Sequence, residues 1–279
     1  MKLIRETVEL FFNGESLDDY SEVRIGQFLE TCGRICYRTE DKITHDSYKS
    51  FMNTIINSGH ESVIEHATIS AKITTNRAVL NELIRHRIGA AYSQESTRYC
   101  NYSGDKFGNE LTFIIPTWVT DEDVNSFCIE DSFRSDCKVH GNPAYIWWRT
   151  MYDAERNYLT SLEWGWRPEQ ARELLPNSLS STIMVTYNLR QWRHVLKQRL
   201  DKRCHPQMRY LMVLIGRQLL NSLPTFFVIL SSDSDIFLII SSDLSLLFLK
   251  KKKPNIMPII APQRIYTMII CIFYLNKAT

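Results

Sequence analysis

The side chains most able to do chemistry in this chain are concentrated between residues 85 and 99. This stretch combines three arginines and a histidine with serine and threonine hydroxyls, a glutamine and a glutamate. A guanidinium group binds phosphate through paired hydrogen bonds and keeps its charge at every physiological pH. Ser96, Thr97 and Arg98 could therefore form a small cradle for an anion. The alternative is a basic helix end followed by a solvated loop. If the Arg-His-Arg triplet is considered by itself, this alternative is favoured.

A helix over residues 76–84 is the element expected to position this stretch. Asn76 suits the N-cap of that helix. An apolar stripe follows at helical spacing, made of Val79, Leu80, Leu83 and Ile84. The basic residues 85–87 would end the helix, because cations suit the negative end of its dipole. The apolar pattern is lost after Gly89, so the sequence predicts a loop over 90–99.

A second polar cluster, residues 59–66, contains two histidines and two glutamates. His60, Glu65 and His66 are of metal-ligand types, but their spacing is not that of a helical zinc-binding pair, which argues against a metal. Ser62, followed by Glu65 three positions later, fits a capping box at the start of a helix. The residues alone leave both interpretations open.

Taken in chain order, several strings resemble those of the flavin-dependent thymidylate synthases, over residues 20–227. The strings are His60-x-Ser62-x-x-Glu65-His66, Arg85-His86-Arg87 with Ser96 and Arg98-Tyr99, Ala171-Arg172-x-x-Leu175-Pro176, and Asn188-x-Arg190 with His194 and Arg199. The chain departs from the family in one place. Residues 88–95 separate the Arg-His-Arg triplet from Ser96, which is one residue more than in the family's commonest form. The extra residue falls near Gly89, where a loop can absorb it.

The resemblance implies an enzyme that makes dTMP from dUMP, with 5,10-methylenetetrahydrofolate as carbon donor and NADPH-reduced FAD as hydride donor. It also implies a homotetramer with active sites at subunit interfaces. The residues implied in FAD binding are Ser62, Glu65, Arg85, His86, Arg87, Gln94, Asn188, Arg190 and His194. Those implied in binding dUMP are Glu82, Arg85, Gln94, Glu95, Ser96, Thr97, Arg98, Arg172 and Arg199. The Arg-His-Arg triplet is expected to lie near the folate as well.

Arg199 is implied as the catalytic residue, and its chemistry suits that role. C5 of uracil is a poor nucleophile, and a permanent cation can stabilise negative charge spread over the pyrimidine ring. Arg98 and Arg172 could hold the phosphate and so fix the base in place. Cys100 lies outside the matched strings and has no evident base beside it, so we expect it to be structural and not a nucleophile.

Other classes of function compete with this hypothesis. Residues 186–217 carry eight lysines or arginines against one aspartate, which a nucleic-acid-binding protein would explain through phosphate contacts. A metal-dependent hydrolase could be built from the 59–66 cluster together with His86. Neither class accounts for the string at 85–99. An inactive homologue of the family would retain all the strings.

Bulk composition narrows the class of protein. The chain has 279 residues, of which 44% are apolar, and a net charge of +2, so a sizeable core is possible and no polyanion partner is indicated. Seven cysteines without metal-type spacing indicate a reducing compartment. Its first residues lack a signal-peptide layout, and no run reaches the ~18 apolar residues of a membrane helix. We expect a cytoplasmic protein with no membrane span and no nucleic-acid partner.

The expected fold class is α+β, with a mostly antiparallel sheet packed by helices. Apolar alternation predicts strands over 2–12, 67–74, 111–115 and 181–187. Helical spacing predicts helices over 21–37, 47–58, 144–163, 167–176, 188–200 and 205–223. Residues 117–143 are predicted to be an irregular excursion. We expect a catalytic domain over 1–228, followed by an atypical tail, 229–279, that is poorly structured or, alternatively, a membrane-surface segment.

Overall fold

The computed structural model of the chain describes residues 1–17, 22–130 and 142–227. The chain divides into two units, Met1–Ser242 and Asp243–Thr279, and every described residue belongs to the first. The predicted tail, 229–279, lies outside the described residues, as does the 131–141 part of the predicted excursion.

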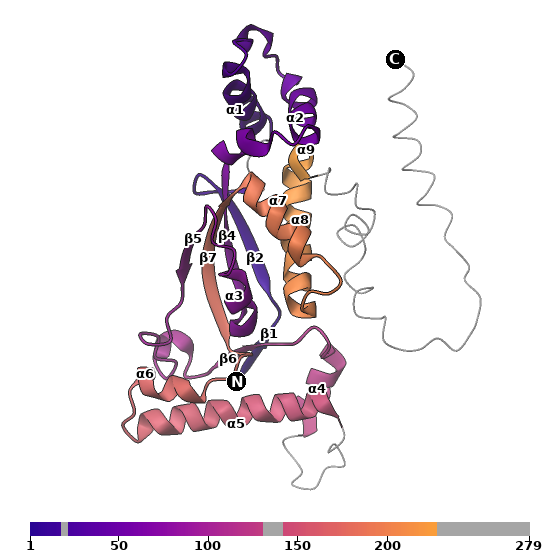
Figure 1. Ribbon diagram of the computed structural model, residues 1–279. Coiled ribbons are helices and arrows are strands. Elements are labelled where there is room, and N and C mark those ends of the chain that lie inside the picture. Colours follow the sequence, from indigo (N-terminus) through magenta and orange to yellow (C-terminus); the bar gives the residue numbers. More distant parts are fainter. Residues whose placement is uncertain (18–21, 131–141, 228–279) are drawn as a thin grey trace, which may run out of the picture. The chain divides into compact units, whose positions relative to one another are not determined.

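A five-stranded antiparallel sheet runs through the described part of the chain, with strand order β3-β2-β4-β7-β5 (Figure 1). Its strands are β2 (Thr7–Phe12), β3 (Glu15–Ser16), β4 (Thr68–Asn76), β5 (Ala91–Gln94) and β7 (Ser180–Asn188). β4 and β7 pair along their whole length, from Thr68 opposite Asn188 to Asn76 opposite Ser180. The predicted α+β class with a mostly antiparallel sheet is confirmed.

One face of this sheet is buried because apolar side chains alternate along its strands. Fully buried side chains of the two central strands are Ile69, Ala71, Ile73, Ile183, Val185 and Tyr187. Three helices lie along this sheet in Figure 1: α3 (Arg77–Leu83), α7 (Leu189–Arg199) and α8 (Pro206–Ser222). Trp192 of α7 packs edge-on against Tyr187 and donates its indole N–H to the main-chain oxygen of Ile69, which anchors α7 to both strands.

The remaining helices form two packed groups, α2 with α1 and α9, and α5 with α4 and α6. Their bounds are α1 (Glu22–Ile35), α2 (Ser47–Asn57), α4 (Asp121–Glu130), α5 (Pro143–Glu163), α6 (Pro168–Ala171) and α9 (Pro224–Phe227). Short 3-10 helices are η2 (Glu40–Lys42), η3 (Glu61–His66), η4 (Asp105–Phe107) and η5 (Arg172–Leu174). Gly26 of α1 is required for close packing, because a Cβ there would lie 2.1 Å from the ring of Tyr48 in α2. No helix within the described ranges combines the length and hydropathy needed to cross a bilayer.

Asparagine side chains cap the starts of α3 and α7, and the first of these caps was predicted from the sequence. The side chain of Asn76 accepts a hydrogen bond from the main-chain N–H of Val79 at the start of α3. Asn188 does the same for Gln191 at the start of α7, and both contacts measure 2.8 Å. Each cap satisfies an N–H group that the helix itself leaves without an acceptor.

The prediction of a single strand over 2–12 is wrong. Residues Lys2–Ile4 form β1, which pairs in parallel with β6 (Thr112–Ile114) in a separate two-stranded sheet. Placing the 111–115 strand in the main sheet is therefore wrong as well. The chain leaves one sheet and enters the other at Arg5 and Glu6.

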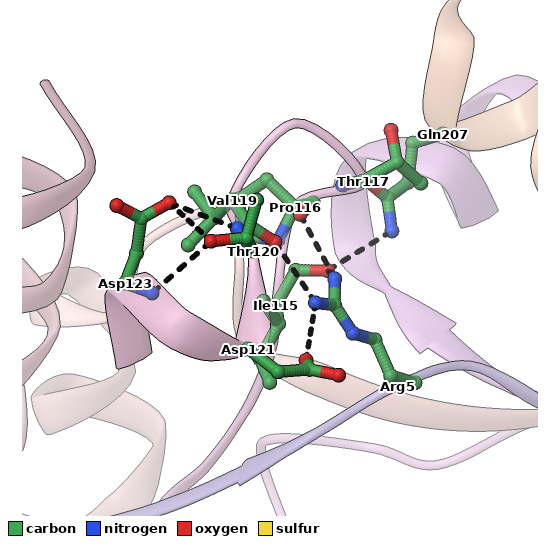
Figure 2. Close-up of polar contacts among 9 residues, drawn as sticks. All are labelled: Arg5, Ile115, Pro116, Thr117, Val119, Thr120, Asp121, Asp123 and Gln207. Carbon is green, nitrogen blue, oxygen red and sulfur yellow. Dashed lines mark hydrogen bonds and ion pairs between the residues drawn. The ribbon is translucent and has the colours of Figure 1, made fainter. Parts of the chain in front are cut away.

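Polar contacts around Arg5 explain the break between β1 and β2. Its guanidinium donates to the main-chain oxygens of Pro116 (3.1 Å) and Val119 (2.8 Å) and forms a 2.6 Å ion pair with Asp121 (Figure 2). Glu6 is buried and accepts a hydrogen bond from the amide of Gln207. Alternation of apolar residues carries no sign of these contacts, which join segments more than a hundred residues apart.

Three further local predictions need correction. Residues 91–94, predicted as loop, form β5 because their main chain pairs with β7. Part of the predicted irregular excursion is helix α4. The proposed capping box at Ser62 does not form, since η3 begins at Glu61 after His60 and has no side-chain cap.

Candidate active site

The Arg-His-Arg triplet leaves helix α3 with its middle residue turned inward. His86 is buried at 8% exposure, whereas Arg85 and Arg87 are exposed and have no side-chain partner among the described residues. The main-chain N–H of His86 bonds to the oxygen of Leu83 at 3.1 Å, which continues the helical turn past the end of α3. The triplet thus supplies one interior imidazole and two free surface cations.

His86 meets Arg199, the last residue of α7, and Glu82 of α3. Nε of Arg199 donates to Nε2 of His86 at 2.8 Å. Its Nη1 contacts Oε2 of Glu82 at 3.2 Å, and its Nη2 donates to the main-chain oxygen of Glu82 at 3.1 Å. We call these three residues the Arg199 cluster. The fold brings them together although more than a hundred residues separate α3 from Arg199.

The imidazole of His86 is neutral in this setting. Burial, and then the charges of Arg199, His194 and Arg85, lower the pKa of His86 from 6.5 to about 4. Because Nε2 accepts from Arg199, the ring proton belongs on Nδ1. A neutral acceptor is what a buried cation requires beside it, since an imidazolium there would add a second positive charge.

Two tyrosines that the sequence analysis did not single out support the cluster. The hydroxyl of Tyr92 in β5 bonds to the main-chain oxygen of His86 at 2.5 Å and to the hydroxyl of Tyr187 in β7 at 2.6 Å. Burial raises the pKa of both phenols, so they stay protonated and can donate. Tyr187 belongs to the predicted alternation of its strand, but Tyr92 has meaning only once β5 is recognised.

An open cavity of ≈ 620 Å³ lies beside the cluster, at the end of α7. Its lining residues are His194, Lys197, Gln198, Arg199, Asp201, Arg203 and Cys204. Asp201 is paired with Arg203 at 2.9 Å, and Sγ of Cys204 lies 4.0 Å from Nη1 of Arg199. With three cations against one carboxylate, the cavity favours an anionic or electron-rich ligand.

Residues 94–97 are held against the edge of β7. Gln94 contacts Ser181 at 3.4 Å, and Thr97 is buried. The carboxylate of Glu95 accepts from the Tyr102 hydroxyl at 2.9 Å and from the Thr182 main-chain N–H at 3.3 Å, so both of its oxygens have protein partners. That arrangement fixes the course of the chain toward Ser96 and Arg98.

Arg98 and Arg172 lie in a second, more exposed region. Arg98 is 55% exposed and pairs only loosely, at 3.8 Å, with Glu169 of α6. Arg172 follows α6 directly and lies 3.6 Å from its neighbour Glu173. Within the described ranges, no hydrogen bond or ion pair links either arginine to the Arg199 cluster.

The predicted flavin residues Glu65 and Arg190 form an ion pair of 2.5 Å between η3 and α7. Glu61 joins them, at 3.8 Å from Arg190 and 3.1 Å from Arg193. Ser62 and His194 are exposed, and Asn188 caps α7 as described above. No group of three or more His, Cys, Asp or Glu side chains that could hold a metal occurs among the described residues.

Known proteins are similar to this chain in sequence and in fold. A flavin-dependent thymidylate synthase of Pyrococcus abyssi is 33% identical over 170 residues, which is 61% of this chain and 61% of that protein. One from Mycobacterium sp. strain KMS is 30% identical over 203 residues, covering 71% of this chain and 77% of its own length. The crystal structure of a UMP/dUMP methylase, PolB from Streptomyces cacaoi, bound with 5-Br dUMP, superposes with a TM-score of 0.62 at 21% identity. It covers 83% of this chain and 97% of PolB, so the fold is shared.

The family comparison covers the same part of the chain as the site. Residues 24–225 match the family described as Thymidylate synthase complementing protein, and this range contains every predicted site residue. The chain therefore belongs to the thymidylate synthase complementing protein family.

Proposed function

We propose that this protein is a flavin-dependent thymidylate synthase that converts dUMP to dTMP. The carbon donor is 5,10-methylenetetrahydrofolate, and NADPH supplies the reducing equivalents through FAD. The observation that carries the proposal is the fixed guanidinium of Arg199 at the wall of a cationic cavity. Family membership supports it, and so does PolB, which by its title is a UMP/dUMP methylase bound with a dUMP analogue.

The cavity beside Arg199 suits a pyrimidine. Its volume of ≈ 620 Å³ lies within the range common for small-molecule sites. Arg199 remains 19% exposed there, so guanidinium N–H groups can face a carbonyl oxygen of uracil. A cation at that edge stabilises the negative charge that the ring gains as C5 becomes nucleophilic.

The phosphate of dUMP is bound, in this proposal, by the exposed region that contains Arg98 and Arg172. Arg98 and Arg172 offer guanidinium groups whose carboxylate partners, among the described residues, are loose and exposed. Ser96 lies beside Arg98, and its hydroxyl already accepts from the Arg98 main-chain N–H at 3.4 Å. Because charge-assisted bonds to phosphate are stronger than such exposed pairs, the nucleotide would replace them.

The proposed site for FAD is formed by residues of η3, of α7 and of the Arg-His-Arg triplet. Arg190 is 51% exposed, and Arg85 and Arg87 are exposed with no side-chain partner among the described residues. The two phosphates of FAD would supply acceptors for Arg85 and Arg87. When bound, the flavin supplies the hydride, and the protein's part is to bind and orient it. Ser62, Glu65, Gln94, Asn188 and His194 complete the proposed flavin set.

A homotetramer is part of the proposal. The free cations Arg85 and Arg87 point to ligands or subunits beyond those that one copy supplies, and the Arg98 region lacks any bond to the Arg199 cluster among the described residues. Cytoplasmic location is proposed with it, in keeping with a nucleotide-making enzyme.

Nucleic-acid binding gains no support from the basic stretch at 186–217. Four of its cations have carboxylate partners within the fold: Arg190 with Glu65, Arg193 with Glu61, Arg199 with Glu82 and Arg203 with Asp201. The extra residue near Gly89 falls where the backbone makes a left-handed turn, with φ of 59° at Gly89, just before β5. We propose an active enzyme in preference to an inactive homologue.

Absorbance spectroscopy of the purified protein tests the proposal first. We expect flavin bands that shift when dUMP is added, followed by dTMP formation with NADPH and 5,10-methylenetetrahydrofolate. A protein that stays colourless after incubation with FAD, and makes no dTMP, would contradict the proposed function.

A further inference from the structure

The guanidinium group of Arg199 has protein acceptors at all three nitrogens, and Arg199 also lines the cavity. Nε, Nη1 and Nη2 each have a protein partner, and two of these three contacts are made by Glu82. A planar guanidinium that is held at all three nitrogen atoms cannot rotate freely, so its exposed edge keeps one direction. The protein therefore determines where the charge of Arg199 points before any ligand arrives.

Glu82 stands on a rigid support. It lies near the end of α3, whose start is capped by Asn76 and whose inner side chains Val79, Leu80 and Leu83 are fully buried. The main-chain oxygen of Glu82 bonds to Nη2, and its carboxylate contacts Nη1. One well-anchored residue thus defines the plane of the guanidinium, and His86 defines its third corner.

Charge argues against a direct contact between Glu82 and the reacting ring. A carboxylate beside a pyrimidine that gains negative charge would raise the energy of the transition state by repulsion. Instead, the carboxylate forms an ion pair with Arg199 at 3.2 Å. The side chain of Arg199 is only 19% exposed, and that of Glu82 only 30%. Its effect on the reaction is then geometric.

We propose that Glu82 is a positioning residue, which, together with His86, orients Arg199 toward the cavity and acts on the substrate only through Arg199. This inference rests on the function proposed above. It differs from a role for Glu82 in binding dUMP directly, and the two roles predict different kinetics.

A double-mutant cycle separates the two roles. Flavin oxidation is followed in single turnovers at saturating dUMP in wild type, Glu82→Ala, Arg199→Ala and the double variant. We expect Glu82→Ala to lower the rate about tenfold with less than about a threefold change in the Kd of dUMP, because a misdirected guanidinium loses transition-state contact. We expect no further loss when Glu82→Ala is added to Arg199→Ala. Equal losses in both backgrounds, or an unchanged rate in Glu82→Ala, would overturn the proposal.

Two matched variants guard against a merely structural effect. Glu82→Gln keeps an oxygen acceptor for Nη1, so it should restore most of the rate lost in Glu82→Ala. Glu9→Gln removes a carboxylate from a cross-strand ion pair between β2 and β4, Glu9 with Lys72 at 2.9 Å, and should leave the rate unchanged. A Glu82→Gln variant as slow as Glu82→Ala would count against positioning.

A measurement on the resting protein keeps this test separate from that of the enzyme activity. The ¹⁵N resonance of His86 Nε2 reports whether that atom accepts a hydrogen bond, and it needs neither FAD nor dUMP. We expect it to move in Glu82→Ala, as Arg199 reorients, and not in Glu9→Gln. If the resonance moves but the protein neither takes up FAD nor forms dTMP, the proposed function is wrong and the positioning contact still stands. An unmoved resonance would overturn the positioning role whatever the activity.

Discussion

The Arg199 cluster and the Arg98–Arg172 region hold the same chemical group in opposite states. Arg199 is largely buried, and all three of its guanidinium nitrogens have protein partners between 2.8 and 3.2 Å away. Arg98 is 55% exposed and lies 3.8 Å from the carboxylate of Glu169, and Arg172 is 39% exposed and lies 3.6 Å from that of Glu173. The guanidinium of Arg199 is oriented by the protein alone, whereas those of Arg98 and Arg172 are available to bind an anion.

Under the proposed function, this contrast separates two tasks in the handling of a nucleotide. A group that must stabilise charge developing in the transition state gains most from being fixed beforehand, because it then needs no reorganisation during the reaction. A group that binds phosphate contributes equally to the ground state and the transition state, and a surface arginine suffices for it. Substitutions in the two regions should therefore change different kinetic constants.

The largest effect is expected for Arg199→Lys. Lysine keeps a positive charge but cannot contact His86 and both acceptors of Glu82 at once. We expect kcat to fall about 100- to 1,000-fold, a loss similar to that of one preorganised charge-stabilising donor. Steady-state dTMP formation measures it, with the flavin absorbance as a check that FAD is still bound. A variant with near-normal kcat and a raised KM would remove the distinction between the regions.

In the exposed region, Arg98→Ala and Arg172→Ala should act on binding. Loss of one charge-assisted hydrogen bond costs about 1.5–3 kcal/mol, so the KM of dUMP should rise about ten- to a hundredfold in each variant. At saturating dUMP, kcat should stay within about threefold of wild type. Uridine-type substrates without phosphate offer the control, since both variants should treat them as wild type does. A fall in kcat with unchanged KM would mean that these arginines, too, act in the transition state.

A smaller effect concerns the pH dependence of stability through His86. Its folded-state pKa of about 4 lies below the ordinary 6.5, because burial, Arg199, His194 and Arg85 oppose the charge. Between these two values the unfolded chain binds a proton that the folded chain does not. Stability should therefore fall as pH drops from 6.5 toward 4, by at most about 1.4 kcal/mol per pH unit from this residue.

His86→Gln offers the comparison for that slope. Glutamine can accept from Nε of Arg199 but does not titrate. Denaturant unfolding at several pH values should give a difference between wild type and variant that shrinks as the pH falls through this window. A constant difference would show that His86 takes up its proton equally in both states.

The sequence predicted local features of this site well. The helix over 76–84 was found from its cap, Asn76, and its apolar stripe, and the helix over 188–200 from its apolar stripe alone, because these are local signals. Resemblance to a family supplied Arg199 and His86 as site residues. Their mutual contact bridges more than a hundred residues, and no spacing rule contains it.

What the sequence missed depends on distant partners. β5 is four residues long and contains serine and glutamine, so only its pairing with β7 makes it a strand. Tyr92 was overlooked for the same reason, although it bonds to His86 and Tyr187. The break between β1 and β2 likewise arises from contacts of Arg5 with residues 116–121.

The smallest effect is expected for Cys100→Ala, just beyond the Arg98 region. Cys100 is partly buried against the cluster that contains Tyr102, Leu111 and Phe113. Burial and the nearby Glu95 raise the pKa of its thiol, so the nucleophilic thiolate is scarce at neutral pH. We expect the variant to keep most of its activity and to lose about 1 kcal/mol or less of stability, through lost packing alone. Loss of turnover with intact dUMP binding would instead make Cys100 a nucleophile, and charge stabilisation by Arg199 would no longer suffice to explain the reaction.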